Sequence, residues 1–296
     1  MAKDLAAAFP AARAVFDTVD AALGVPLSTL AFDGPAEELT LTHNAQPALL
    51  AHGAAVWAVV RERVALQVVA AAGHSLGEFT AYHAAGAIGL ADAATLVRRR
   101  GQLMYDTGVQ RPGAMAAILG DTTTPIEAIC ATAAAQAGPV VAANYNSPGQ
   151  VVISGEVAGV EKAMELAKAA GARKAIRLAV SGAFHSPLMA PAVDGLRDAL
   201  VAANVGDAAF PVVANVDAEP KARAAEIRDG LLRQLTAPVQ WSSVMGRLAT
   251  SWPDALFVEL GPGSVLGGLA KKIAPNVAVM SCGTVADVEQ LLAKVA

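Results

Sequence analysis

The spacing of hydrophobic and polar positions divides the first third of the chain into helices and one strand. Apolar side chains recur at helical spacing over residues 3–23, with a break at Pro10. A second helix is expected over residues 47–63, with Pro47 in its first turn. The apolar run at 64–72 predicts a strand buried on both faces of a parallel sheet. Helical spacing returns at 76–85, so residues 64–85 are expected to form a strand, a sharp turn and a helix in that order.

The middle of the chain alternates short apolar runs with helical stretches. Strands are expected at 114–119, 140–144, 150–154 and 174–178, and helices at 125–137 and 157–170. This β-α-β-β-α-β order is the ferredoxin-like pattern. We therefore predict an α/β protein with two units. Residues 1–111 and 182–296 form a large α/β-hydrolase-like unit with a parallel sheet, and residues 112–181 form an inserted ferredoxin-like α+β subdomain.

Composition excludes several classes of protein. The chain has 296 residues, of which 54% are hydrophobic and 16% charged, so it can bury a sizeable core and is not disordered as a whole. Its net charge of −4 argues against a dedicated nucleic-acid binder. The longest apolar stretch is too short to span about 30 Å of hydrocarbon, and no leader pattern is visible, so we expect a cytoplasmic protein. Cys130 and Cys282 lack the spacing of a zinc site or a disulfide framework.

A candidate nucleophile follows the predicted strand. Gly73-His74-Ser75-Leu76-Gly77 has the Gly-x-Ser-x-Gly pattern of a nucleophile elbow, in which a strained turn exposes the serine hydroxyl. The glycines are expected to give room for the tight turn. The Leu76 N–H, at the start of the following helix, would face a developing oxyanion. A serine at this position can also be an ordinary helix cap, but the strand and helix on either side favour the elbow.

Serine needs a base to act as a nucleophile near neutral pH, and histidine is the usual one. Four of the five histidines lie in or beside the segments around the elbow, where a ring rarely turns back to the serine: His43, His52, His74 and His83. His185 lies in a glycine-bearing loop far along the chain and is the best candidate. A loop histidine taken alone is more often a surface residue.

Several blocks together are similar in order and spacing to the malonyl-CoA:acyl-carrier-protein transacylase family. They lie at 46–49, 73–78, 98–101, 113–117, 144–150, 181–189, 238–241 and 259–263. The resemblance implies ping-pong transfer of a malonyl group from malonyl-CoA, through Ser75, to the phosphopantetheine thiol of acyl carrier protein, with His185 as general base and acid. It implies fatty acid biosynthesis, no cofactor or metal, and a monomer that binds neither nucleic acid nor membrane. A polyketide carrier remains an alternative.

The resemblance also assigns the residues around the nucleophile. Arg100 would hold the malonyl carboxylate, which suits the two parallel hydrogen bonds that a guanidinium can donate. Gln46 would line the pocket, although a polar residue at a helix start fits equally well. Gln240 would support His185 through a backbone carbonyl, in place of an acidic third residue. Phe184 would leave little space for a methyl branch on the substrate, giving a preference for malonyl.

Two alternatives and one departure from the family stay open. The elbow alone also fits a serine hydrolase or thioesterase. Three basic clusters, at 98–100, 173–174 and 271–272, are either solvated helix faces or contacts for an acidic carrier protein.

Members of the family usually open with a strand and a Gly-Gln-Gly-x-Gln loop that supplies a second oxyanion donor, and the sequence given begins after such a segment. We therefore also weigh a late start codon and a shortened, carrier-binding relic with little activity.

Overall fold

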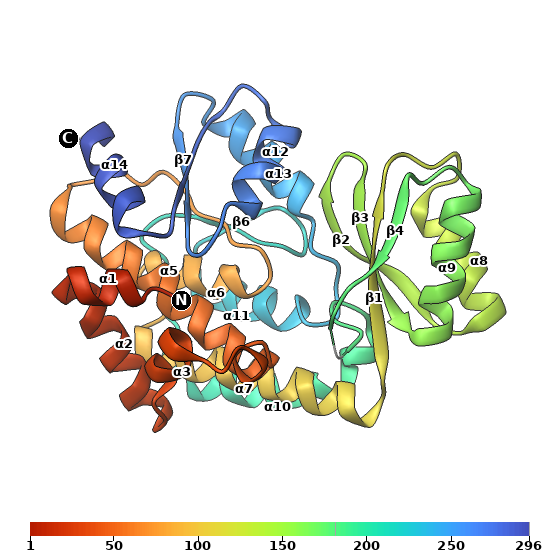
Figure 1. Cartoon of the computed structure of the whole chain (residues 1–296), viewed down its shortest axis with the longest axis horizontal. Helices are drawn as coiled ribbons and strands as arrows, with labels where there is room; N and C mark the ends of the chain where they lie inside the picture. Colours follow the sequence, from red (N-terminus) through yellow and green to blue (C-terminus); the bar gives the residue numbers. More distant parts are fainter. Residues whose placement is uncertain (181, 296) are drawn as a thin grey trace.

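The computed structural model describes residues 1–180 and 182–295. Ser181 and Ala296 lie outside the described residues. Ser181 belongs to the block that contains His185 and is the last residue of the predicted ferredoxin-like subdomain. The chain forms a mixed α/β structure with a larger and a smaller lobe (Figure 1). In the larger lobe the helices are α1 (Lys3–Ala8), α2 (Pro10–Leu23), α3 (Leu27–Asp33), α4 (Ala36–Leu39), α5 (Thr42–Arg63), α6 (Leu76–Ala84), α7 (Leu90–Gln110), the 3-10 helix η1 (Pro187–Ala192), α10 (Val193–Ala202), α11 (Ala224–Arg233), α12 (Trp241–Ser251), α13 (Val265–Ile273) and α14 (Val285–Val295). Its strands are β5 (Val212–Val213), β6 (Pro220–Lys221), β7 (Leu256–Leu260) and β8 (Ala278–Cys282).

The smaller lobe is a four-stranded antiparallel sheet covered by two helices on one face. Its elements are β1 (Gly113–Leu119), α8 (Ile126–Ala137), β2 (Val140–Ser147), β3 (Gln150–Glu156), α9 (Val157–Ala169) and β4 (Lys174–Arg177). The strand order is β2-β3-β1-β4. The β-α-β-β-α-β order expected from the sequence is therefore observed. The short apolar runs of this lobe form strands in which alternate residues face different cores. Ala116 and Ile118 of β1 pack under the helices, whereas Met115 faces a second cluster that includes Phe184.

Helix α5 forms the centre of the larger lobe, with α2, α6 and α7 packed around it. Its apolar residues are buried around most of the helix rather than along one stripe. The helix begins at Thr42, five residues before the predicted start, so Pro47 lies inside it. Proline cannot donate to the carbonyl four residues earlier, which is that of His43. That oxygen accepts a hydrogen bond from Arg98 Nη1 instead, at 2.9 Å, so the early start leaves the carbonyl paired.

The predicted buried strand at 64–72 does not form. In the described part of the chain its backbone pairs with another strand only around Ala71, whose N–H donates to the carbonyl of Pro211 (3.0 Å) and whose carbonyl accepts from Val213 (2.9 Å). None of its residues is fully buried. Residues 66–72 and β7 both line a cavity of about 880 Å³, and β7 pairs only with β8 among the described strands. The prediction was wrong because an apolar run indicates an apolar environment but not a neighbouring strand edge.

None of the described helices is long and apolar enough to cross a membrane.

Candidate active site

Ser75 occupies a strained turn immediately before α6. Its backbone has φ 51° and ψ −105°, outside the regions that L residues usually adopt. Gly73 allows the turn, because a Cβ at that position would lie 2.0 Å from the backbone of Gly77. Gly77 itself has open space where its Cβ would be, so the expected need for space at the second glycine was wrong. The turn places the serine hydroxyl within hydrogen-bond distance of side chains from other parts of the chain, as expected for a nucleophile elbow.

Asn215 holds both sides of this turn. Its side-chain Oδ1 accepts a hydrogen bond from the Ser75 N–H at 2.7 Å, and its Nδ2 donates to the carbonyl of Gly73 at 2.8 Å. The residue is fully buried, just after β5. The side chain therefore takes the place of a neighbouring strand and keeps the strained backbone groups paired.

His185 is brought to the serine from 110 residues away. Its Nε2 lies 2.7 Å from Ser75 Oγ, and its Nδ1 lies 2.9 Å from the backbone carbonyl of Gln234. A carbonyl can only accept a hydrogen bond, so Nδ1 carries the proton and Nε2 is the acceptor for the serine hydroxyl. Burial, together with the charge of Arg100, lowers the pKa of His185 to about 3, so the ring is neutral near neutral pH and the lone pair of Nε2 is free to face the serine hydroxyl.

The carbonyl that orients His185 belongs to Gln234 and not to Gln240. Gln240 lies at the N-terminal end of α12, and its own N–H donates to the backbone carbonyl of Asn215 at 2.8 Å. The block at 238–241 is therefore close to the site but supports the elbow through Asn215. The prediction that Gln240 supports His185 was therefore wrong, because the supporting carbonyl belongs to the residue six positions earlier. The sequence could not identify this carbonyl, because Gln234 comes directly after helix α11 and belongs to no motif.

Arg100 lies on α7 with 1% of its surface exposed, beside the serine. Its Nη2 donates to Ser75 Oγ at 3.0 Å and to Gln234 Oε1 at 2.9 Å, and its Nη1 donates to Gln46 Oε1 at 2.6 Å. Its Nε has no partner among the described residues. Burial lowers the Arg100 pKa to about 10, which still leaves the guanidinium charged at neutral pH. A buried cation with a free N–H beside a nucleophile can bind an anionic group of a substrate.

The other predicted residues occupy different positions around this centre. Gln46, on α5, is buried and holds Arg100, and its Nε2 donates to Thr42 Oγ1 at 2.9 Å. Leu76 is the first residue of α6, so its N–H has no acceptor within the helix. Phe184 is partly buried and packs against clusters of both lobes. Its effect on substrate choice stays a prediction.

Three residues of the site had no role assigned from the sequence, and all three are fully buried: Glu78, Asn215 and Gln234. Glu78 lies in the recognised block at 73–78, and its position in the first turn of α6 is a signal that could have drawn attention to it. Asn215 follows the short apolar run of β5. Gln234 gives no signal, because its contacts come from three distant parts of the chain.

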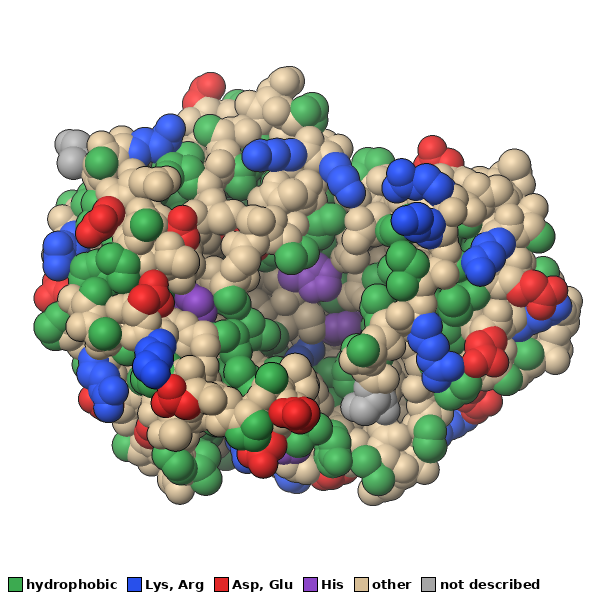
Figure 2. Space-filling view, in the orientation of Figure 1, with side chains coloured by type: hydrophobic (Ala, Val, Ile, Leu, Met, Phe, Trp, Pro, Cys, Tyr) green, Lys and Arg blue, Asp and Glu red, His purple; other side chains and the backbone are tan. Residues whose placement is uncertain are grey.

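The site lies where the two lobes meet. Figure 2 shows histidine side chains in the hollow between them. His74 links the elbow to the smaller lobe, because its Nε2 lies 2.9 Å from Oδ1 of Asn146 on β2. Gly73, His74 and Leu76 also line the cavity of about 880 Å³ that borders β7. No group of three or more metal-binding side chains occurs in the part of the chain that the structure describes.

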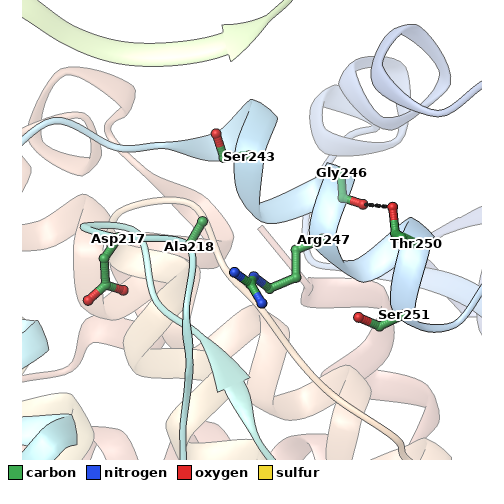
Figure 3. A pocket seen from close by; sticks show the side chains of 7 residues that line it. All are labelled: Asp217, Ala218, Ser243, Gly246, Arg247, Thr250 and Ser251. Atoms are coloured by element: carbon green, nitrogen blue, oxygen red, sulfur yellow. Dashed lines mark hydrogen bonds between the residues drawn. The ribbon is translucent and has the colours of Figure 1, made fainter.

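A second, smaller pocket is separate from this centre. It has a volume of about 400 Å³ and lies between the turn before β6 and helix α12 (Figure 3). Arg247 extends into it, and its guanidinium pairs with Glu219. Thr250 donates to the backbone carbonyl of Gly246 at 2.9 Å. The side chains of Arg247 and Thr250 are therefore engaged with neighbours, and among the described residues no histidine lines the pocket to activate its serines.

Comparison with known proteins gives one consistent result. Residues 1–285 match the family model described as an acyl transferase domain. The malonyl CoA-acyl carrier protein transacylase of Bacillus subtilis (strain 168) is 45% identical over 273 residues, which cover 92% of this chain and 86% of that protein. The crystal structure of acyl-carrier-protein-S-malonyltransferase from Bartonella henselae has a TM-score of 0.94 at 40% identity, covering 100% of this chain and 94% of that one. A malonyl-transacylase solved in complex with a type II PKS acyl-carrier protein also has a TM-score of 0.94, at 40% identity, covering 99% of this chain and 94% of that one.

Proposed function

This chain belongs to the malonyl-CoA:acyl-carrier-protein transacylase family of acyltransferases, and from that membership we propose that it transfers a malonyl group from malonyl-CoA to the phosphopantetheine thiol of an acyl carrier protein. The observation that supports the malonyl group most directly is the buried Arg100, whose Nη2 lies 3.0 Å from Ser75 Oγ. A general hydrolase of esters would have no need for a buried cation at that position. The two partners of the chain are malonyl-CoA and the carrier protein.

The first half of the reaction acylates Ser75. His185 Nε2 accepts the hydroxyl proton as Oγ attacks the thioester carbonyl of malonyl-CoA. The resulting oxyanion faces the N–H of Leu76 and the positive end of helix α6. When the tetrahedral intermediate collapses, the bond to sulfur breaks, and the CoA thiolate takes the proton from the imidazolium and leaves as the thiol. The products are malonyl-serine, neutral His185 and CoA.

The second half runs the same steps with a different thiol. The phosphopantetheine thiol gives its proton to His185 Nε2, and the thiolate attacks the malonyl-serine ester. Ser75 Oγ leaves and recovers the proton from the imidazolium, which restores the starting state. Gln234 keeps Nδ1 protonated in both halves, because its carbonyl accepts the Nδ1–H at 2.9 Å.

Arg100 gives the site its preference for a dicarboxylic acyl group. Its Nε–H has no partner among the described residues, and the Nη2 N–H that now contacts Ser75 Oγ can turn to the substrate instead, so the two N–H groups form an edge that can donate two parallel hydrogen bonds to a carboxylate. Acetyl-CoA lacks the carboxylate and leaves this buried edge unpaired.

A transfer assay tests the proposed function. Malonyl-loaded protein is incubated with and without holo carrier protein, and both free malonate and malonyl carrier are measured. We expect rapid formation of malonyl carrier and slow release of malonate without it. Release of malonate at the same rate with and without carrier would mean that the chain is a hydrolase. Ser75→Ala is the control and should give neither product.

A further inference from the structure

Glu78 is a fully buried carboxylate three residues after the nucleophile. Its Oε2 accepts hydrogen bonds from Gln234 Nε2 at 2.7 Å and from the backbone N–H of Asn215 at 3.1 Å. Its Oε1 has no partner among the described residues. A buried carboxylate is costly unless its contacts compensate for lost hydration, and both contacts here belong to residues that hold the site.

Gln234 joins Glu78 to Ser75, Arg100 and His185. Its Nε2 donates to Glu78 and to the carbonyl of Ser75, the latter at 2.9 Å. Its Oε1 accepts from Arg100 Nη2 at 2.9 Å. Its backbone carbonyl accepts from His185 Nδ1. The side chain of Gln234 therefore lies between a buried anion and a buried cation.

The charge of Glu78 favours one orientation of the Gln234 amide, the same orientation that the Ser75 carbonyl and Arg100 require. An ionised carboxylate can only accept hydrogen bonds, so it requires the NH₂ group of Gln234 on its side. That orientation presents the amide oxygen to Arg100. If the amide turned over, its NH₂ group would face the guanidinium, and two donors would oppose each other without an acceptor. The Arg100 Nη2 contact depends on an oxygen in this place.

We propose that ionised Glu78 is a positioning residue for malonyl recognition, which acts through the amide of Gln234 to hold Arg100 beside Ser75. This inference rests on the proposed function, because it assigns Arg100 to the malonyl carboxylate. Glu78 does not touch the substrate. Its effect is on the direction of the guanidinium edge that the carboxylate binds.

Because Glu78 titrates, its effect on Arg100 through Gln234 should depend on pH. Burial raises the Glu78 pKa to about 7, against opposing effects of Gln234, Asn215 and Arg100. The charged or titratable groups that face Glu78 are Arg100 on α7, Tyr82 on α6 and Asp217 after β5. Arg100 has a pKa of about 10, and burial raises the Tyr82 pKa still further, so neither changes charge near neutral pH. His185, with a pKa of about 3, is neutral over the same range.

The test compares acylation of Ser75 by malonyl-CoA and by acetyl-CoA in Glu78→Gln, a change that keeps shape and removes charge. The malonyl-to-acetyl ratio of kcat/KM should fall by roughly tenfold, because acetyl transfer does not use the Arg100 edge. In the unmodified chain the same ratio should fall from about pH 8 to about pH 6 as Glu78 takes up a proton, and in the variant it should be low and independent of pH. Asp20→Asn is the matched control, because the Asp20 carboxylate holds Ser28 away from the site, and its ratio should not change.

The possible outcomes distinguish the positioning role of Glu78 from the proposed function. A folded Glu78→Gln protein with an unchanged ratio, or with equal losses for both acyl groups, would overturn the positioning role. If the variant does not fold, a ratio that stays constant from about pH 8 to about pH 6 in the unmodified chain would overturn it instead. An unmodified chain that accepts neither acyl group would contradict the proposed function itself.

Discussion

Arg100 is the residue in which the chemistry of this site is concentrated. Side-chain oxygens of Gln46 and Gln234 fix two of its nitrogen atoms, and the Nη2 that contacts Gln234 also reaches Ser75 Oγ. The helix carries three consecutive arginines, yet Arg99 is exposed and Arg100 is buried. This difference follows from the helical period, which turns successive residues to different faces.

Replacing Arg100 separates malonyl binding from general acyl transfer. Arg100→Ala should lower kcat/KM for malonyl-CoA by roughly 10²-fold, because a buried charge-assisted pair is lost, and should lower the value for acetyl-CoA much less. Arg99→Ala is the matched control and should change neither value. Steady-state acylation with both thioesters measures the effect. Equal losses for the two thioesters in Arg100→Ala would refute the carboxylate role.

At this scale the sequence predicts the reactive groups better than the groups that hold them. Ser75, His185 and Arg100 lie in recognised blocks, and the structure brings all three within hydrogen-bond distance. Gln234 and Asn215 could not be found, because their side chains pair with backbone and side-chain groups that are distant in sequence. Such contacts depend on the finished fold and leave no local spacing.

At the scale of elements, the turn between residue 72 and helix α6 fixes the nucleophile. The turn depends on the backbone of Gly77 approaching Gly73 more closely than any Cβ permits. Asn215 replaces the pairing that a full neighbouring strand would give. The elbow is thus stabilised by one glycine and by the side-chain amides of Asn215 and Gln234, and not by an extended sheet.

The two glycines of the elbow should respond in opposite ways to alanine. Gly73→Ala should lower the free energy of unfolding by roughly 2–4 kcal/mol and abolish acylation, because the new Cβ overlaps the backbone of Gly77. Gly77→Ala has open space and lies in α6, so it should leave stability unchanged or raise it by up to about 1 kcal/mol. Urea denaturation of both variants checks this. A stable, active Gly73→Ala protein would show that the turn is not constrained in this way.

The ferredoxin-like lobe could be predicted because its strands and helices are short, periodic and adjacent in the chain. Its strands pair with strands of the same segment, so local pattern and final topology agree. The extended segment at 64–72 could not be predicted as it is, since strand formation needs the edges of neighbouring strands, and among the described residues of this segment only Ala71 meets one, at Val212 of β5. Local hydrophobicity carries no information about whether those edges are in reach.

At the scale of the whole molecule, the two lobes are joined next to the reactive centre. Backbone hydrogen bonds connect β2 to the segment before α12: Tyr145 donates to the carbonyl of Val239, and Val239 donates to the carbonyl of Ala143, both at 2.9 Å. His74 and Asn146 add a side-chain contact between the lobes. The two sides of the hollow that holds the site are therefore joined by strand-like pairing across the lobes.

The histidines make the stability of the whole molecule sensitive to acid. Burial lowers the pKa of all five, His185 to about 3. Below about pH 6.5 the unfolded chain binds protons that the folded chain does not, so stability present above that pH is lost as the pH falls. Each histidine contributes at most about 1.4 kcal/mol per pH unit, and the raised pKa of Glu78 opposes one of them.

We therefore expect the free energy of unfolding to fall from about pH 7.5 to about pH 5.5. Urea denaturation at several pH values measures it, and His185→Gln should show a shallower decrease. A free energy of unfolding that is constant or higher at the lower pH would contradict neutral, buried histidines.

The position of the covalent malonyl group tests the Ser75 mechanism most directly. The protein is mixed briefly with malonyl-CoA, quenched with acid and digested. Mass spectrometry of the peptides then locates the acyl adduct. We predict one malonyl group, carried as an ester by Ser75 and absent from Ser75→Ala. An adduct on another residue, or no adduct under conditions in which malonyl carrier protein forms, would contradict the Ser75 mechanism.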